Sequence, residues 1–179
     1  LNPPAIILGL VIAPLIVLYP LAKRFFIIPQ LVLAMIYNWG SIIGWVTIQS
    51  PYKFDNILIL YSALIIWTII YDTIYATQDE MDDRKMKLYS SVIFFDSKRF
   101  QIINFLICLK YALLCFFAYS LNYHFIFYVL IISVFIVNLL DIHMKWKNLS
   151  QNALGYFKRN NHYALLILFS IMIGSQLNV

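Results

Sequence analysis

The sequence predicts an all-α, polytopic transmembrane helical bundle with about six spans. Of its 179 residues, 63% are hydrophobic and only 12% are charged, which is too apolar for a soluble domain with one core. Apolar runs close to the roughly 20 residues that a bilayer-crossing helix needs recur along the chain. Because no repeat or low-complexity segment separates these runs, we expect residues 1–179 to form a single transmembrane domain.

Proline and asparagine residues set the expected helix ends. We expect Pro14 to kink the first helix, Pro20 to end it and Pro29 to lie in the opening turn of the second. Asn122 marks a tight turn between the fourth and fifth helices. The expected helices cover residues 4–18, 30–49, 56–76, 99–120, 123–143 and 160–177.

The basic residues predict the orientation of the helices. Eleven of the thirteen Lys and Arg residues fall in, or directly at the end of, the expected connections after the first, third and fifth helices. By the positive-inside rule, that side faces the cytoplasm, or the matrix in a mitochondrion. Topology thus accounts for the net charge of +5, and we expect no nucleic-acid partner. Cys108 and Cys115 would lie about 10 Å apart on one helix face, too far for a disulfide, so we expect two small buried residues.

Several ionisable or amide residues lie within the expected spans or near their ends: Asn38, Asp72, Asn104, Lys110, Asn138, Asp141 and His143. Asn104 and Asn138 are expected to make hydrogen bonds between helices. Asp141 and His143 lie near a cytoplasmic helix end, where reaching out to the membrane interface is the simpler explanation. Lys110, if it faces the bundle, could meet an acid, but the sequence does not identify which one.

The chain concentrates its acids in one short stretch. Five of its eight Asp and Glu residues fall within the thirteen residues 71–83: Asp72, Asp79, Glu80, Asp82 and Asp83. On a continuous helix, Asp72, Asp79 and Asp83 would share one stripe with Tyr75, and Asp82 would widen the acidic face. Such a row of carboxylates favours a counter-cation, and Mg²⁺ is a natural ligand for carboxylate and phosphate oxygens. The alternative is a solvated acidic loop balanced by neighbouring Lys and Arg residues.

This stretch closely resembles the second aspartate-rich signature of the UbiA superfamily of intramembrane prenyltransferases, and most closely its 4-hydroxybenzoate polyprenyltransferase branch. The resemblance continues along essentially the whole chain, which would correspond to the C-terminal six of the family's nine helices. The matching segments are Tyr19–Arg24, Pro29–Leu33, Asn38–Gly40, Tyr71–Ala76 with Gln78, Asp79, Asp82 and Asp83, and Phe157–Lys158 with Asn160 and Asn161 in the loop before the last helix.

The resemblance implies roles for individual residues. It implies that Asp79 and Asp83, with Asp82 beside them, hold Mg²⁺ and that Tyr19 and Lys23 contact a diphosphate. Lys23, Asp79 and Asp83 would be catalytic, and substrate would also contact Asn38, Asp72 and Tyr75.

The implied reaction transfers a polyprenyl group from its diphosphate to 4-hydroxybenzoate in ubiquinone biosynthesis. Magnesium would promote departure of the diphosphate, and aromatic side chains would face the allylic cation. The implied location is a bacterial or mitochondrial inner membrane, with lipid around the helices.

The sequence also departs from the family pattern. Its first aspartate-rich motif, Asn-Asp-x-x-Asp-x-x-x-Asp, does not occur in these 179 residues, so we expect the chain alone to be catalytically incomplete. A second polypeptide carrying the missing N-terminal helices is one way to complete it. Lys87 and Asp96 stand where relatives tend to have glycine, and Tyr89 stands where they have lysine. An inactive remnant and a non-enzymatic membrane protein that binds cations or lipids therefore remain as alternatives.

Overall fold

The computed structural model describes residues 2–48 and 54–177, and these residues form helices without any β-strand. Long helices make up most of this part of the chain: α1 (Pro3–Leu18), α3 (Pro29–Ile48), α4 (Phe54–Ala76), α7 (Arg99–Ser120), α8 (Phe125–Lys145) and α9 (Leu149–Gln176). Shorter helices connect them: η1 (Tyr19–Leu21), α2 (Ala22–Phe25), α5 (Glu80–Lys85), α6 (Ser91–Phe95), η2 (Asp96–Lys98) and η3 (Trp146–Asn148). The all-α prediction is confirmed.

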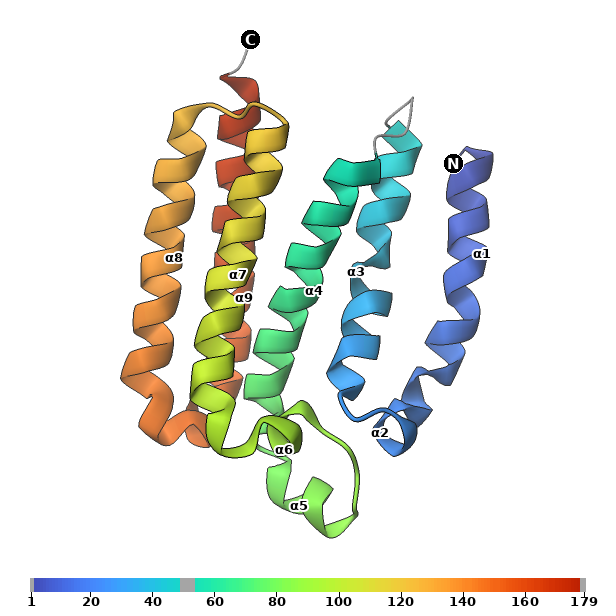
Figure 1. Cartoon of the computed structure of the whole chain (residues 1–179), viewed down its shortest axis with the longest axis vertical. Helices are drawn as coiled ribbons and strands as arrows, with labels where there is room; N and C mark the ends of the chain where they lie inside the picture. Colours follow the sequence, from blue (N-terminus) through green and yellow to red (C-terminus); the bar gives the residue numbers. More distant parts are fainter. Residues whose placement is uncertain (1, 49–53, 178–179) are drawn as a thin grey trace.

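The long helices are apolar enough to cross a membrane. Within the described residues, five continuous helical stretches have the necessary length and hydropathy. The last of them, Phe125–Gln176, contains both α8 and α9, which reverse direction at η3 and run side by side (Figure 1). The chain is therefore an integral membrane protein.

Helix α4 lies at the centre of the arrangement. Helix α3 packs on one side of it with α1 beyond, whereas α7 and α9 pack on the other side and α8 completes that half (Figure 1). Ile70 and Ile74 of α4 belong to a large buried cluster with α7, α8 and α9, while Ile57 and Tyr61 belong to a smaller one with α3. Both faces of α4 are thus buried, which fixes the two halves of the bundle against it.

Helices α8 and α9 approach closely at Gly174. A Cβ atom at this position would lie 2.7 Å from Cβ of Phe127 and 3.2 Å from the ring of Tyr123. The Gly174 carbonyl also accepts a hydrogen bond of 3.0 Å from the His124 N–H. The missing side chain therefore lets the start of α8 lie directly against the end of α9.

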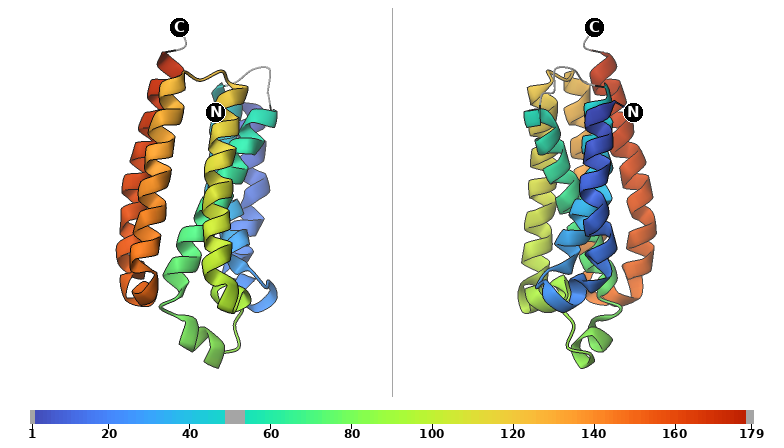
Figure 2. Two further views of the ribbon diagram at one scale, coloured as in Figure 1. Left: turned by 60° about the vertical axis from the view of Figure 1, so that its left-hand side comes forward. Right: turned by 90° about the vertical axis from the view of Figure 1, so that its right-hand side faces the viewer.

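The connections after α1, α4 and α8 all lie at one end of the bundle, and the start of α1 and the end of α9 lie at the other (Figure 2). The helices thus bring the segment with most of the acids next to α2. This is also the end at which the sequence predicts the basic residues to gather.

Most predicted helix boundaries agree with the structure to within two residues, and Asn122 adopts the expected turn with φ of 56°. The predicted end of the second helix at residue 49 lies outside the described residues. The predicted start of the last helix at residue 160 is wrong, because α9 begins at Leu149. Its polar first turns are stabilised by contacts that sequence does not show: Asn152 donates to the Asn148 carbonyl, Arg159 donates to Asp141, and Asn160 accepts from Trp67.

Candidate functional site

Lys23 and Asp83 meet at the end of the bundle where α5 folds against α2. The Lys23 Nζ donates to both carboxylate oxygens of Asp83, each at 3.1 Å. The Asp83 side chain is buried, whereas that of Lys23 is 42% exposed. The Tyr89 N–H donates to the Lys23 carbonyl at 2.9 Å, so both the backbone and the side chain of Lys23 hold the acidic segment.

The segment after α5 is also anchored to α3 and α4. The buried Gln30 side chain accepts a hydrogen bond of 2.9 Å from the Ser91 N–H and donates one of 3.4 Å to the Ser90 hydroxyl. The Ser91 and Thr73 hydroxyls are 2.7 Å apart. Buried polar groups that satisfy one another in this way favour one conformation of the segment.

The acids of the motif do not share one helix, so the expected continuous stripe is wrong. Helix α4 ends at Ala76, and Asp79 is the N-cap residue of the separate helix α5. The Asp83 N–H donates to the Asp79 carbonyl at 2.9 Å, which keeps these two residues one turn apart. The turn also leaves Asp72 close, because the charges of Lys23 and Asp79 both act on its carboxyl group.

Tyr19 lies near the same group of charges, since Asp72 acts electrostatically on its hydroxyl. The structure therefore gathers Tyr19, Lys23, Asp72, Asp79 and Asp83 from η1, α2, α4 and α5.

The other two acids of the motif pair with basic neighbours. Asp82 is exposed and lies 3.3 Å from Lys85. Glu80 lies 2.9 Å from both Arg84 and Arg99, and Arg84 also lies 2.9 Å from Asp96. The hydrogen bonds of Arg84 to Glu80 and Asp96 raise the pKa of its guanidinium group. These ion pairs direct Glu80 and Asp82 away from the Lys23–Asp83 pair.

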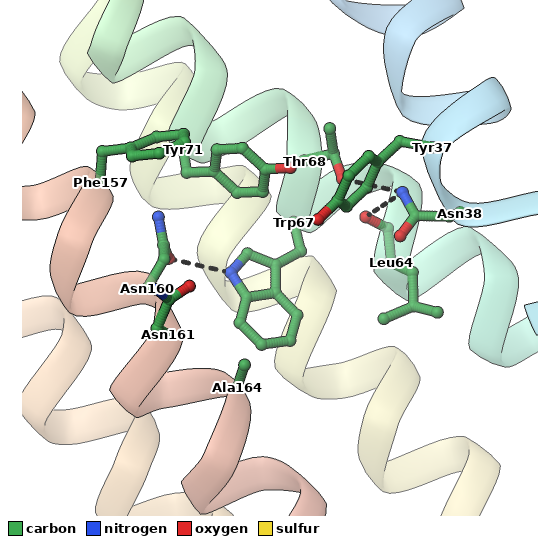
Figure 3. A pocket seen from close by; sticks show the side chains of 10 residues that line it. All are labelled: Tyr37, Asn38, Leu64, Trp67, Thr68, Tyr71, Phe157, Asn160, Asn161 and Ala164. Carbon is green, nitrogen blue, oxygen red and sulfur yellow. Dashed lines mark hydrogen bonds between the residues drawn. The ribbon is translucent and has the colours of Figure 1, made fainter. Parts of the chain in front are cut away.

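A cavity of about 250 Å³ lies beside this polar site, between α3, α4 and α9 (Figure 3). Asn38 lines it and donates to the Thr68 hydroxyl at 2.8 Å. Tyr71 packs edge-on against Phe157 at 5.6 Å between ring centroids, and Tyr75 lies 5.2 Å from the same ring. The cavity is lined by Tyr37, Asn38, Leu64, Trp67, Thr68, Tyr71, Phe157, Asn160, Asn161 and Ala164.

Tyr71 connects the cavity to the acids, because it lines the cavity and directly precedes Asp72. Two predicted substrate contacts, Asn38 and Tyr75, thus lie in or beside the cavity, and the others lie in the polar site.

Several polar contacts were not predicted from the sequence. Lys110 is buried, with its Nζ 4.8 Å from the Trp67 ring centroid and 4.1 Å from that of Tyr111. It forms no ion pair with any described residue. The Trp67 indole N–H donates to the Asn160 Oδ1 at 3.0 Å. The position of Lys110 in the middle of a span indicated a buried polar contact. Nothing in the sequence indicated the Trp67–Asn160 hydrogen bond.

Asp141 does not reach out to the interface as predicted. It is buried and accepts hydrogen bonds from Lys145, from Arg159 at 2.9 Å and from Tyr163 at 3.2 Å. Two basic side chains and a hydroxyl therefore hold its charge between α8 and α9.

The two asparagines of the spans behave differently. Asn138 donates to the Tyr156 hydroxyl of α9 at 3.3 Å, which confirms its predicted bond between helices. Asn104 instead donates within α7, to the Phe100 carbonyl at 2.9 Å.

The free carboxylates bear on whether Mg²⁺ fits. No group of three or more His, Cys, Asp or Glu residues among those described could hold a metal ion by itself. Asp72 and Asp79 make no side-chain hydrogen bond to a described residue, and the Asp83 carboxylate is hydrogen-bonded to Lys23 alone among the described side chains. Mg²⁺ commonly takes one or two protein carboxylates and completes its shell with water and substrate phosphate. These carboxylates fit an ion that arrives with a phosphate.

Comparison with known proteins gives a family for the chain. The sequence model of the UbiA prenyltransferase family matches residues 1–171. The 4-hydroxybenzoate octaprenyltransferase of Francisella tularensis subsp. tularensis is 36% identical over 176 residues, which cover 97% of this chain and 60% of that protein. The mitochondrial 4-hydroxybenzoate polyprenyltransferase of Aedes aegypti is 45% identical over 95 residues, or 53% of this chain and 22% of that protein. Its counterpart in Drosophila melanogaster is 43% identical over 95 residues, or 53% and 24%.

No solved structure matches the chain significantly. The chain spans about three fifths of the length of its bacterial relative. The family match covers all of the described long helices up to Ile171 of α9. The chain belongs to the UbiA prenyltransferase family.

Proposed function

We propose that this chain supplies one side of an intramembrane site that transfers a polyprenyl group from its diphosphate to 4-hydroxybenzoate, as in ubiquinone biosynthesis. The names of its relatives support this reaction. The observation that best supports the proposal is the position of the Lys23–Asp83 pair, which lies beside the free carboxylates of Asp72 and Asp79 and next to an aromatic cavity. Such a site combines charge for a diphosphate with an apolar space for the reacting carbon.

The polar residues have distinct tasks in the proposed reaction. Lys23 turns from Asp83 to the diphosphate and neutralises charge on the leaving pyrophosphate. Asp79 and Asp83 hold Mg²⁺ through their carboxylates, and Tyr19 and Asp72 border the same space. When bound, Mg²⁺ polarises the diphosphate oxygens and favours breaking of the carbon–oxygen bond.

The cavity side chains have a different task. Tyr71, Tyr75 and Phe157 present aromatic surfaces near the acids, where ring faces stabilise a developing allylic cation. The apolar walls limit access of water to that cation. The electron pair of the new carbon–carbon bond comes from the acceptor ring, which then loses a proton.

We also propose that residues outside these 179 complete the site, because the first aspartate-rich motif does not occur in them. That motif would contribute carboxylates from the opposite side of the diphosphate. It can lie on the same or a second polypeptide. The polar site would face the cytoplasm or matrix, since its end of the bundle carries most basic residues.

An inactive remnant of such an enzyme is the second candidate. Lys87, Tyr89 and Asp96 replace residues usual in relatives, and they lie in the segment that follows α5 and reaches the start of α7. A non-enzymatic protein that binds cations or lipids is a third candidate, but it gives no reason for an aromatic cavity beside the acids.

A prenyl-transfer assay in membranes tests the proposal. The chain is supplied with Mg²⁺, a polyprenyl diphosphate and 4-hydroxybenzoate, first alone and then with a polypeptide that carries the first aspartate-rich motif. We expect transfer only in the mixture and only with Mg²⁺. Transfer by the chain alone would refute its incompleteness. Absence of transfer in both, with the protein shown to be folded, would favour the remnant.

A further inference from the structure

The amide of Asn160 is oriented by Trp67. An indole N–H can only donate a hydrogen bond, so the Asn160 atom 3.0 Å from Trp67 Nε1 must be the amide oxygen. The amide nitrogen then faces away from Trp67, toward the end of the cavity formed by Tyr71 and Phe157 (Figure 3). It has no hydrogen-bond partner among the described residues, although Asn160 is only 7% exposed.

A buried donor without an acceptor is unfavourable. This one lines a cavity and is held in place by a second side chain. An oxygen atom of a bound ligand would satisfy it.

Lys110 places a buried amino group near the same wall. Its side chain is 1% exposed, and its ammonium group lies over the Trp67 ring. It forms no ion pair within the described parts of the chain, and the rings of Trp67 and Tyr111 compensate only part of the loss of water. An anion in the cavity would favour the charged form of this lysine.

These features select a class of ligand. No charged residue is among the described residues that line the cavity, and the unpaired Asn160 amide nitrogen offers a hydrogen-bond donor there. A diphosphate would need several cationic contacts, which the described lining lacks. A cavity of about 150 Å³ can hold benzene, so one of about 250 Å³ can hold a substituted ring between the aromatic walls. The fitting ligand is a planar aromatic ring with one negative charge.

We propose that the cavity between α3, α4 and α9 binds the aromatic acceptor through its carboxylate, which accepts a hydrogen bond from Asn160 and is attracted by Lys110. This inference rests on the proposed function, since it assigns a place to the acceptor. Asn160 is a specificity-determining residue, and Trp67 and Lys110 are positioning residues that act through the amide and the local charge.

Equilibrium binding to the full chain in lipid nanodiscs tests the proposal. The probes are radiolabelled 4-hydroxybenzoate and, as a competitor, 4-methylphenol, which has the same ring but no carboxylate. We expect the wild-type chain to bind 4-hydroxybenzoate at least about tenfold more tightly than 4-methylphenol. Asn160→Asp preserves an acceptor for Trp67 but replaces the donor with a negative charge. It should weaken 4-hydroxybenzoate binding at least about tenfold and change 4-methylphenol binding less than about twofold.

Lys110→Met, which removes the charge at similar length, should produce the same loss of selectivity. The matched controls are Asn152→Asp, elsewhere on α9, and Lys147→Met in η3, both outside the cavity. They should leave both affinities within about twofold. If Asn160→Asp does not fold, Asn160→Ala removes the donor without adding charge and must reduce the same selectivity.

Equal wild-type affinity for the two probes, no binding of 4-hydroxybenzoate, or parallel loss of both probes in the variants would overturn the proposal. These outcomes are separate from failure of the proposed reaction. Prenyl transfer with unchanged selectivity in the variants would refute the acceptor site alone. Selective binding without transfer in the assembled system would refute the reaction and leave the binding site.

Discussion

Lys23 forms an ion pair with Asp83, whose carboxylate is a metal ligand in the proposed reaction. Because its ammonium group contacts both oxygens of Asp83, the ion pair holds this carboxylate in place. In the proposed reaction, a diphosphate would offer Lys23 an alternative anion, and Asp83 would then be free to hold Mg²⁺. The ion pair thus positions Lys23 to bind the diphosphate and Asp83 to bind the metal ion in the proposed reaction.

Asp83→Asn tests this role at the level of one residue. The substitution preserves shape but removes the negative charge, so Mg²⁺-dependent prenyl transfer in the assembled system should fall at least about 100-fold. Asp82→Asn is the matched control, because Asp82 is exposed and pairs with Lys85. It should leave the rate within about threefold. Equal losses in the two variants would contradict the distinction between adjacent acids.

The distinction between these acids could not be made from the sequence. The spacing of Asp79 and Asp83 predicted that they lie one turn apart, and the structure confirms that relation. The spacing did not reveal that Asp82 turns toward Lys85 while Asp83 turns toward Lys23, because Lys23 is 60 residues away in the sequence. The unpaired amide nitrogen of Asn160 could not be predicted from the sequence either, since the orientation of the amide depends on Trp67, which is 93 residues away.

The segment from α5 to α7 adopts backbone conformations suited to glycine although it carries larger residues. Lys87 has φ of 55° and Asp96 has φ of 40°. Asp96 has ψ of −120°, a combination that L-residues with a Cβ strongly disfavour. Both residues stand where the sequence resemblance leads us to expect glycine. Both positions therefore carry a backbone conformation that glycine would adopt at a lower cost in stability.

Asp96→Gly should therefore stabilise the folded protein. Relief of strain at this position is worth about 1 kcal/mol or more, whereas the exposed contact with Arg84 contributes less. We expect the midpoint of thermal unfolding in detergent, followed by circular dichroism, to rise by about 2–4 °C.

Ser97→Gly is the control in the next position, where φ is not positive. It should leave the midpoint unchanged or lower it, since glycine gains more freedom in the unfolded chain. A fall in the midpoint for Asp96→Gly would show that the contact with Arg84 outweighs the strain.

Apolar patterns predicted the first five long helices, but not the start of α9. The pattern works where a helix is apolar throughout, as in α7, whose predicted bounds 99–120 match the structure. It fails over 149–159, where polar residues suggest a loop although Asp141 and Asn148 provide partners for them. Contacts between helices decide the structure there, and one sequence does not display them.

At the scale of the whole molecule, α4 divides the bundle into two halves that meet at the proposed site. Lys23 comes from the half with α1 and α3, and Asn160 comes from the half with α7, α8 and α9. The cavity lies between these halves. A change in their separation would therefore alter the distance between the diphosphate and acceptor sites.

The predicted membrane orientation can be tested with cysteines at the two ends of α7. This helix has 22 residues, so it extends about 33 Å, close to the roughly 30 Å thickness of the hydrocarbon core. Ser97→Cys and Ser120→Cys place exposed thiols just before and at the end of it. Cys108, which is exposed and not buried as predicted, and Cys115 are first replaced by alanine, which should affect folding little because neither forms a disulfide.

With the chain in a bacterial inner membrane, an impermeant maleimide added to spheroplasts should label Ser120→Cys and spare Ser97→Cys. Inverted membrane vesicles should give the opposite result, because eleven of the thirteen basic residues place the Ser97 end in the cytoplasm. Labelling of both thiols from one side would show that α7 does not cross the membrane. The reverse pattern would preserve the span but place the acidic site outside, away from a cytoplasmic supply of prenyl diphosphate and Mg²⁺, and would thereby contradict the proposed orientation.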